Sequence, residues 1–147
     1  MIHRGAAIWI AVIGLLVAAP GQAADSLVIV VRADSPIENL SNLELRKIYL
    51  GIALRLDDEV IRGLRNVSDE MLDRIFLQNI VAMSERTYQR RLLTFTLRYG
   101  RPRPPEVSDS EELLARLSAD PYAISYMWKA DAEDRKEIKI LRAIWRE

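Results

Sequence analysis

The segment that most constrains the fold is Ser26–Arg32, SLVIVVR, in which five large apolar residues follow one another. Successive side chains of a β-strand point to opposite faces of its sheet, so this strand would be apolar on both faces. Such a strand is stable only when both faces are covered, as in parallel or mixed sheets flanked by helices. The segment therefore predicts a buried strand in an α/β domain.

Helical patterns occupy much of the chain after this strand. Each expected helix begins at a serine, whose hydroxyl can accept a hydrogen bond from the first turn, and Glu44 completes a capping box with Ser41. Glycines are placed to end two of the helices. The helices are expected from Ser41 to Gly51, from Ser68 to Met83, from Ser84 to Gly100, and from Ser108 or Ser110 to Leu117.

Three shorter apolar runs predict further short strands, at about Val60–Leu64, about Ala123–Met127 and Glu137–Trp145. The segment Arg101–Val107 holds three prolines, so regular structure is not expected there. Strands and helices thus alternate along the chain as they do in α/β proteins. We expect an α/β fold with a small mixed sheet flanked by helices.

The first 24 residues form a pattern typical of a secretory signal peptide. A basic start at Met1–Arg4 is followed by the uncharged run Gly5–Pro20 and by small residues at Gly21 and Ala23. The run is shorter than the roughly 20 residues that a membrane-spanning helix needs, which favours cleavage at Ala23 or the next residue over retention as an anchor. We expect a periplasmic protein in which residues 25–147 form a single domain.

The residue types that enzymes use most are scarce in this chain. His3 is the only histidine and lies in the expected signal peptide, and cysteine is absent. Zinc sites of the usual composition and serine–histidine or cysteine–histidine catalysis are therefore excluded. No glycine-rich phosphate loop is present. We predict no catalytic residue, no metal site, no cofactor and hence no enzyme.

The acidic residues and the net charge do not suggest other chemistry. Asp57–Asp58 falls in an expected turn and Glu111–Glu112 in the first turn of a helix, where carboxylates complement the helix dipole. Removal of Arg4 with the leader leaves 20 basic residues against 21 acidic ones, a net charge near −1. This balance, together with the secretory leader, predicts no binding to nucleic acid and no stable insertion into a membrane.

One stretch, residues 86–103, holds six arginines and no acidic residue. On a helix Arg86, Arg90 and Arg91 would lie near one another on a basic face. The stretch is a solvated face, a docking surface for an acidic partner, or an anion site, because guanidinium groups bind carboxylate and phosphate alike. The candidate residues for an anion site here are Arg98, Tyr99 and Arg101.

Four motifs occur in an order known from one protein family. Residues 28–51, VIVVRADSPIENLSNLELRKIYLG, are similar to its strand, Asp-x-Pro turn and helix ending in Leu-Gly. Residues 59–66 resemble the next strand with its terminal arginine, residues 72–76 the following helix start, and residues 98–127 a later Pro-Pro to Tyr segment. The family is the phosphate-type substrate-binding proteins of ABC transporters, with the type 2 periplasmic binding protein fold. The likeness covers residues 27–141, is closer to a short single-domain branch, and implies a domain similar to one lobe.

The resemblance also implies a site. In the family, backbone amides and hydroxyls at a helix N-terminus hold the anion, and an arginine precedes them. By resemblance Arg65 takes the arginine position, Ser68 lies in the anion loop, and Ser35 of the Asp-x-Pro turn is a further candidate contact. The loop departs from the family pattern because it lacks glycine and carries Asp69 and Glu70, which would repel a phosphate dianion.

These observations lead to two functional hypotheses. The first is a secreted, non-enzymatic binding domain that binds a small, phosphate-like anion weakly, since one lobe leaves a ligand exposed to water. The second is a periplasmic interaction or sensor-accessory domain that has lost its ligand and docks on an envelope protein such as a transporter or sensor. The candidate ligand-binding residues are Arg65, Ser68, Ser35, Tyr99 and Arg101, and the candidate docking residues are Arg86, Arg90 and Arg91.

Overall fold

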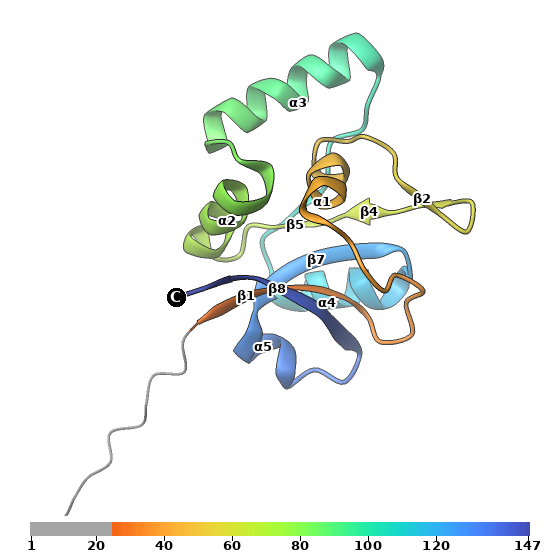
Figure 1. The fold of residues 1–147 in the computed structure, drawn as a ribbon, viewed down its shortest axis with the longest axis vertical. Helices are drawn as coiled ribbons and strands as arrows, with labels where there is room; N and C mark the ends of the chain where they lie inside the picture. Colours follow the sequence, from red (N-terminus) through yellow and green to blue (C-terminus); the bar gives the residue numbers. More distant parts are fainter. Residues whose placement is uncertain (1–24) are drawn as a thin grey trace, which may run out of the picture.

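The computed structural model describes residues 25–147 (Figure 1), so the expected signal peptide, residues 1–24, lies outside the described residues. The helices are α1 (Asn42–Tyr49), α2 (Glu70–Phe76), the π-helix η1 (Leu77–Val81), α3 (Glu85–Tyr99), α4 (Ser110–Ala119) and α5 (Lys129–Glu133). The strands are β1 (Ser26–Arg32), β2 (Arg55–Leu56), β3 (Glu59–Val60), β4 (Arg62–Gly63), β5 (Arg65–Asn66), β6 (Glu106–Val107), β7 (Ala123–Trp128) and β8 (Ile138–Arg146).

The main sheet has the strand order β4-β7-β1-β8. β1 is antiparallel to both neighbours, with Ile29 opposite Tyr126 of β7 and Arg142 of β8, whereas β4 runs parallel to β7. The residues of β1 from Leu27 to Val31 are at most 1% exposed. The expected buried strand and the small mixed sheet flanked by helices are both confirmed.

The side chains of β1 alternate between two hydrophobic clusters. Leu27, Ile29 and Val31 belong to the cluster formed with α1, α2 and η1, and Val28 and Val30 belong to the cluster formed with α4 and α5. Figure 1 shows α1 and α2 on one side of the sheet and α5 on the other. Among residues 25–147, β1 thus contributes to the hydrophobic core on both faces of the sheet.

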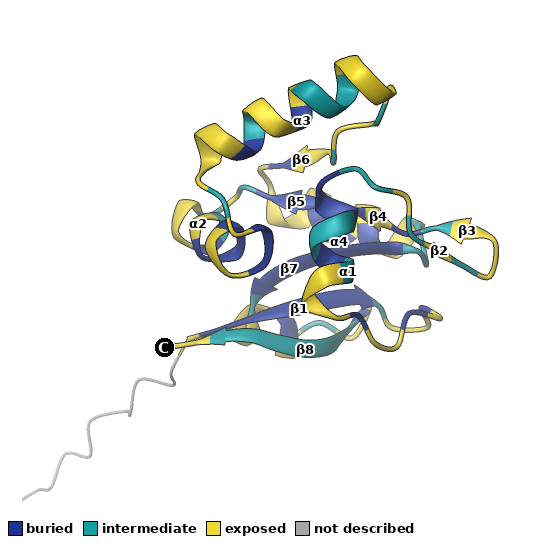
Figure 2. Ribbon diagram, turned by 45° about the horizontal axis from the view of Figure 1, so that its top comes forward, coloured by how far each residue is buried: buried dark blue, intermediate teal, exposed yellow. Residues whose placement is uncertain are grey.

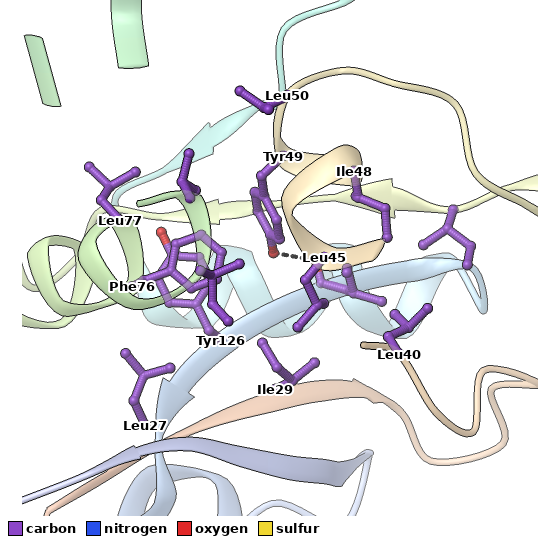
Figure 3. Close-up of a cluster of buried hydrophobic side chains, with 14 of the residues drawn as sticks. Leu27, Ile29, Leu40, Leu45, Ile48, Tyr49, Leu50, Phe76, Leu77 and Tyr126 are labelled. Atoms are coloured by element: carbon purple, nitrogen blue, oxygen red, sulfur yellow. Dashed lines mark hydrogen bonds between the residues drawn. The ribbon is translucent and has the colours of Figure 1, made fainter. Parts of the chain in front are cut away.

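Three aromatic rings lie at the centre of the first cluster (Figure 3). Phe76 stacks on Tyr126 with ring centroids 3.7 Å apart, and Tyr49 meets Phe76 edge-on at 4.6 Å. The Tyr49 hydroxyl donates to the Leu64 carbonyl oxygen at 3.2 Å, and the Tyr88 hydroxyl donates to the Tyr49 carbonyl oxygen. The Tyr126 hydroxyl donates to the Asp73 carboxylate at 2.7 Å. These contacts fix α1, α2 and α3 relative to β7, because each buried tyrosine hydroxyl has a hydrogen-bond acceptor.

The starts of α1 and α3 follow the sequence rules. The Ser41 hydroxyl accepts the N–H of Glu44, while the Glu44 carboxylate accepts the N–H of Ser41 at 2.8 Å, which completes the predicted capping box. Ser84 caps α3 as expected. Gly51 follows α1 with a φ of 74°, and a Cβ at this position would lie 2.6 Å from the Pro102 carbonyl oxygen. Glycine is therefore required here by both conformation and space.

The predicted starts of the other two long helices were wrong by one position. α2 is capped by Asp69 instead of Ser68, and α4 by Asp109 instead of Ser108 or Ser110. Both aspartates accept backbone N–H bonds from the first helical turn. A carboxylate accepts such bonds as well as a hydroxyl does and also interacts favourably with the positive end of the helix dipole.

The expected strand at Val60–Leu64 is divided between different partners. Its beginning, β3, pairs with β2 across a two-residue turn in which Asp57 and Asp58 have φ angles of 52° and 65°. The chain then continues as β4, which joins the main sheet, and as β5, which pairs with β6. Aspartate tolerates positive φ in such hairpin turns better than most residues, so the expected turn closes a hairpin. The segment after it changes its pairing partner at Ile61 and does not form one strand.

Structure in the proline-rich segment was not expected. β6 directly follows the prolines, yet it pairs in parallel with β5. The bonds run from the N–H groups of Arg65 and Val67 to the carbonyl oxygens of Pro105 and Val107, so proline only needs to accept. A missing N–H does not prevent pairing in which proline is the acceptor.

Two further features were not predicted from the sequence. The short helix α5 follows β7 directly, and β8 spans nine residues with two register shifts against β1, where a short strand was expected. No helix within residues 25–147 is long and apolar enough to cross a membrane.

Candidate functional site

Arg65 lies at the start of β5 with only 2% of its surface exposed. Its guanidinium donates to both carboxylate oxygens of Asp73, at 3.0 and 2.5 Å, and to both carboxylate oxygens of Glu85. A further bond reaches Glu106 at 2.9 Å, and the group lies over the Tyr88 ring at 5.2 Å from its centroid. We call Arg65 and these three carboxylates the Arg65 cluster. It joins β5, α2, α3 and β6.

The five hydrogen bonds of the Arg65 cluster use all five N–H donors of the guanidinium. Burial alone would lower the pKa of Arg65, but the bonds to Asp73 and Glu85 outweigh it and raise that pKa. Burial and the Arg65 bond act in opposite directions on Glu85, with a net lowering of its pKa. The position that the family resemblance gives to an anion ligand is therefore occupied by the protein's own carboxylates.

The start of α2, where the family's anion loop would lie, is also occupied from within. One carboxylate oxygen of Asp69 accepts the N–H groups of Met71 at 2.8 Å and Leu72 at 3.1 Å, and the other accepts the indole N–H of Trp128 at 2.9 Å. The Trp128 hydrogen bond is the main cause that lowers the pKa of Asp69. Asp69 thus stands where an external anion would interact with a helix N-terminus.

Ser68 points away from this helix start. Its hydroxyl donates to the Asn66 side-chain oxygen at 2.6 Å, and Asn66 in turn donates to the Tyr126 carbonyl oxygen at 2.9 Å. Both residues line a polar groove of about 560 Å³, to which Asp69, Asp131 and other side chains contribute. Its carboxylates are Asp69, Asp131 and Asp134, and its only cation, Arg135, is paired with Glu111 outside the groove. The negative charge of this groove disfavours an anion.

Ser35 lies in the turn between β1 and α1 and is 4% exposed. Its hydroxyl donates to the Pro121 carbonyl oxygen at 2.5 Å and accepts the N–H of Ile37 at 3.2 Å, while its carbonyl oxygen accepts a bond from Lys139. The predicted Asp-x-Pro turn is therefore held to two distant segments of the chain. The hydroxyl stabilises that turn.

Tyr99 and Arg101 lie together at the end of α3. The Arg101 guanidinium stacks over the Phe95 ring at 4.8 Å and the Tyr99 ring at 5.0 Å, and Tyr99 is 62% exposed. No carboxylate within residues 25–147 forms an ion pair with Arg101. Tyr99 and Arg101 are two of the five residues predicted to bind a ligand. They lie next to each other, and Arg101 has no carboxylate partner within residues 25–147.

α3 carries an exposed surface of mixed character. The helix has 15 residues but buries only Tyr88 and Leu92, and Figure 2 shows it standing away from the sheet with mostly exposed residues. Leu93 is 51% exposed and Leu97 is 77% exposed. Residues 86, 90, 93 and 97 follow helical spacing along the side opposite the buried residues. We call this set the outer face of α3; it consists of Arg86, Arg90, Leu93 and Leu97.

The predicted docking arginines are close to this surface. Arg86, Arg90 and Arg91 are all exposed, and none forms an ion pair with a carboxylate of residues 25–147. Arg91 lies near the Phe95 ring at 5.9 Å, to one side of the outer face. Leu93 and Leu97 were not predicted, because the interpretation of this stretch rested on its arginines and aromatic residues. Their spacing of four residues, in line with Arg86 and Arg90, was the available signal.

The structure does not bring the predicted ligand-binding residues into one site. Arg65 lies within its cluster beneath α3, Ser68 lines the polar groove, and Ser35 belongs to the β1–α1 turn. Within residues 25–147, no group of carboxylates is arranged to hold a metal ion.

No protein-family model and no curated protein matches the chain significantly. Solved structures do match. An ABC-type phosphate transport receptor from Vibrio cholerae is 16% identical with a TM-score of 0.57, over 81% of this chain and 46% of the receptor. PstS from Borrelia burgdorferi is 18% identical with a TM-score of 0.55, over 80% of this chain and 47% of PstS. A possible phosphate binding protein from Planctomyces limnophilus is 18% identical with a TM-score of 0.55, over 81% of this chain and 41% of that protein.

The chain thus spans less than half the length of these three proteins. At identities of 16–18% the likeness concerns the fold and not the ligand. The element order, the mixed sheet and the helices on both faces agree with the expectation drawn from the four sequence motifs. The protein has the fold of part of a phosphate-type substrate-binding protein.

Proposed function

We propose that this chain is a non-enzymatic binding domain of the cell envelope that docks on a partner protein through the outer face of α3. The observation that carries the proposal is the exposure of Leu93 and Leu97, at 51% and 77%, beside two arginines that have no carboxylate partner within residues 25–147. The buried residues of α3 are Tyr88 and Leu92, so Leu93 and Leu97 contribute little to the stability of the domain. Arginine is enriched at protein interfaces, and neighbouring exposed apolar side chains mark a surface that another molecule can cover.

The chemistry of the outer face defines the partner. Leucine side chains contribute about 1.5–3 kcal/mol each when they are fully buried, so the partner must offer an apolar surface at 93 and 97. Arg86 and Arg90 require carboxylates on the same partner, since guanidinium and carboxylate groups form two parallel hydrogen bonds. The expected partner is an envelope protein, a transporter or sensor, with an acidic and partly apolar patch.

The placement in the periplasm rests on two arguments. The pattern of residues 1–24 is typical of a secretory signal peptide. The fold is similar to that of part of a protein from Vibrio cholerae described as an ABC-type phosphate transport receptor. A domain with the same fold is suited to contact an envelope protein such as a transporter.

The proposal is tested by placing a photo-reactive amino acid at Leu97 and, as a matched control, at Ala115, an exposed residue of α4. We expect one protein of the envelope to be cross-linked from position 97 and not from position 115. Substitution of Arg86 and Arg90 by glutamine should reduce that cross-link, and raising the salt concentration should do the same. Equal labelling from the two positions, or a yield that does not depend on the arginines, would contradict docking through this face.

Weak binding of a small anion is the second candidate function, and the fold likeness to proteins described as phosphate receptors favours it. The remaining cation for it is Arg101, with Tyr99 beside it, because the donors of Arg65 are all used. Calorimetric titration with phosphate and sulfate tests it. Binding that disappears in Arg101→Gln but persists in Arg98→Gln would support this function, whereas no heat at millimolar anion would exclude it.

A further inference from the structure

A second groove lies beside β4, the edge strand of the main sheet, and holds about 510 Å³. It is separate from the polar groove at the start of α2 and from the outer face of α3, neither of which shares a residue with it. Its volume falls within the range of about 300–1,000 Å³ typical of small-molecule sites. We call it the apolar groove, because aliphatic side chains and prolines make up most of its walls.

Four segments form these walls. Ile48 and Ile52 come from the end of α1 and the turn after it, Ile61 precedes β4, Pro102 and Pro104 lie on the segment after α3, and the end of α4 closes the groove. The α1 turn and the proline segment touch, since a Cβ on the glycine of that turn would lie 2.6 Å from the Pro102 carbonyl oxygen. Proline has a fixed φ and no N–H donor. The groove is therefore formed in advance and offers few polar groups.

Charge is confined to the rim of the apolar groove. Arg62 is paired with Asp120 through two bonds of 2.5 and 2.8 Å, and Arg116 is paired with Glu112 at 2.6 Å. Arg103 differs, because its guanidinium donates to the side-chain oxygen of Gln89 and forms no ion pair with a carboxylate of residues 25–147. Arg103 thus lines the groove without an ion-pair partner within residues 25–147, and its guanidinium would have to exchange Gln89 of α3 for a ligand head group.

We propose that the apolar groove binds a small amphiphile, an alkyl chain of medium length that carries a carboxylate or phosphate head. The chain would lie between Ile48 and Pro104, and the head would pair with Arg103 at the rim. Each further methylene buried should strengthen binding about fourfold until the groove is filled. The pairing with Arg103 should favour an anionic head over a cationic one by about tenfold.

The test is calorimetric titration of the protein with dodecanoate below its micelle concentration. Dodecylammonium, which has the same chain and the opposite charge, is the comparison. We expect one dodecanoate per protein and at least about tenfold weaker binding of dodecylammonium. Absence of binding by dodecanoate, or equal binding of the two, would overturn the proposal. The proposal would also be overturned if an apolar peptide with a free C-terminal carboxylate bound and dodecanoate did not.

Variants locate the ligand. Ala119→Trp places a large ring in the groove from the exposed end of α4, and Ala115→Trp adds the same ring one turn earlier, outside the groove. The first should abolish dodecanoate binding and the second should leave it unchanged. Ala53→Trp, on the opposite wall, repeats the test if Ala119→Trp unfolds the protein. Retained binding in a folded groove variant would place the ligand elsewhere.

The head-group contact is tested separately. Arg103→Gln should weaken dodecanoate binding about tenfold and leave dodecylammonium binding unchanged or stronger. Arg98→Gln, an exposed arginine of α3 that does not line the groove, should have no effect on either. Equal loss in the two variants would show that the protein's overall charge, and not Arg103, attracts the head group.

Discussion

Arginines play opposite roles in the Arg65 cluster and on the outer face of α3. Arg65 is 2% exposed and its five donors meet three carboxylates, whereas Arg86 and Arg90 are exposed and have no carboxylate partner within residues 25–147. The two regions are adjacent, because Glu85 at the start of α3 is one of the partners of Arg65. The buried arginine holds α3 on the domain, and the exposed arginines on that helix remain available to another molecule.

The role of an arginine in this domain depends on whether carboxylates from other segments lie beside it. Residue type is the same in both regions, and the resemblance to a phosphate-binding family singled out Arg65. Carboxylates from three other segments then converge on it, so that its positive charge is used within the fold. After Glu85, the first residue of α3, the chain has no acidic residue until Glu106 of β6.

Substitution of Arg65 is expected to have the largest effect on stability. Arg65→Met removes the cation and leaves Asp73 buried with two neighbouring carboxylates. Breaking a buried ion pair in this way costs about 3–5 kcal/mol, and we expect the lower end, since Glu85 and Glu106 are half exposed and can turn to water. Urea unfolding measures this loss. Arg90→Met is the matched control, for which a change within about 0.5 kcal/mol is expected.

A loss from Arg65→Met as small as that from Arg90→Met would contradict the comparison. It would mean that the Arg65 cluster does not hold α3 on the domain, and the anion-binding role that the family resemblance implies for Arg65 would have to be reconsidered.

The next largest effect is expected at the start of α2. Asp69→Ala removes the acceptor of two backbone N–H groups and of the Trp128 indole N–H. Loss of a helix N-cap costs about 0.5–2 kcal/mol, and the additional unpaired indole places the expected value near the upper end. Ser68→Ala, one residue earlier, should cost less because its hydroxyl bonds only to Asn66. The order of these two variants, measured by thermal unfolding, tests which residue caps the helix.

Acidic pH should weaken the attachment of α3. Burial raises the pKa of Glu85, but the Arg65 bond lowers it further, so the folded-state pKa lies below the ordinary value of 4.5. A group with a depressed pKa stabilises the fold above its unfolded value, and this contribution is lost as pH falls through the folded value. Stability should therefore decline below about pH 4.5, and less steeply in Glu85→Gln than in the exposed control Glu38→Gln. Identical slopes would assign the decline to other carboxyls.

The sequence predicted the fold better than the candidate site. SLVIVVR predicted a buried central strand because its apolar run is short and rich in β-branched residues. Ser41 with Glu44 predicted the start of α1 through bonds three residues apart. Both are local signals. The occupation of Arg65 depends on Glu85 and Glu106, which lie 20 and 41 residues away, and the apolar groove is built from four separate segments. Contacts between residues far apart in the sequence leave no pattern within one segment, so neither site could be predicted from the sequence.

The smallest stability effect, and the sharpest test of the comparison, is expected from the outer face of α3. Leu93→Ser with Leu97→Ser removes two side chains that are largely exposed, so the free energy of unfolding should change by less than about 0.5 kcal/mol. Leu92→Ser, which alters a leucine that is 4% exposed, should instead cost about 2–5 kcal/mol. Co-purification of the envelope partner should be lost in the double variant although the fold is intact. If the double variant unfolds as readily as Leu92→Ser, the two leucines serve the fold, and the outer face of α3 is part of the domain's own packing.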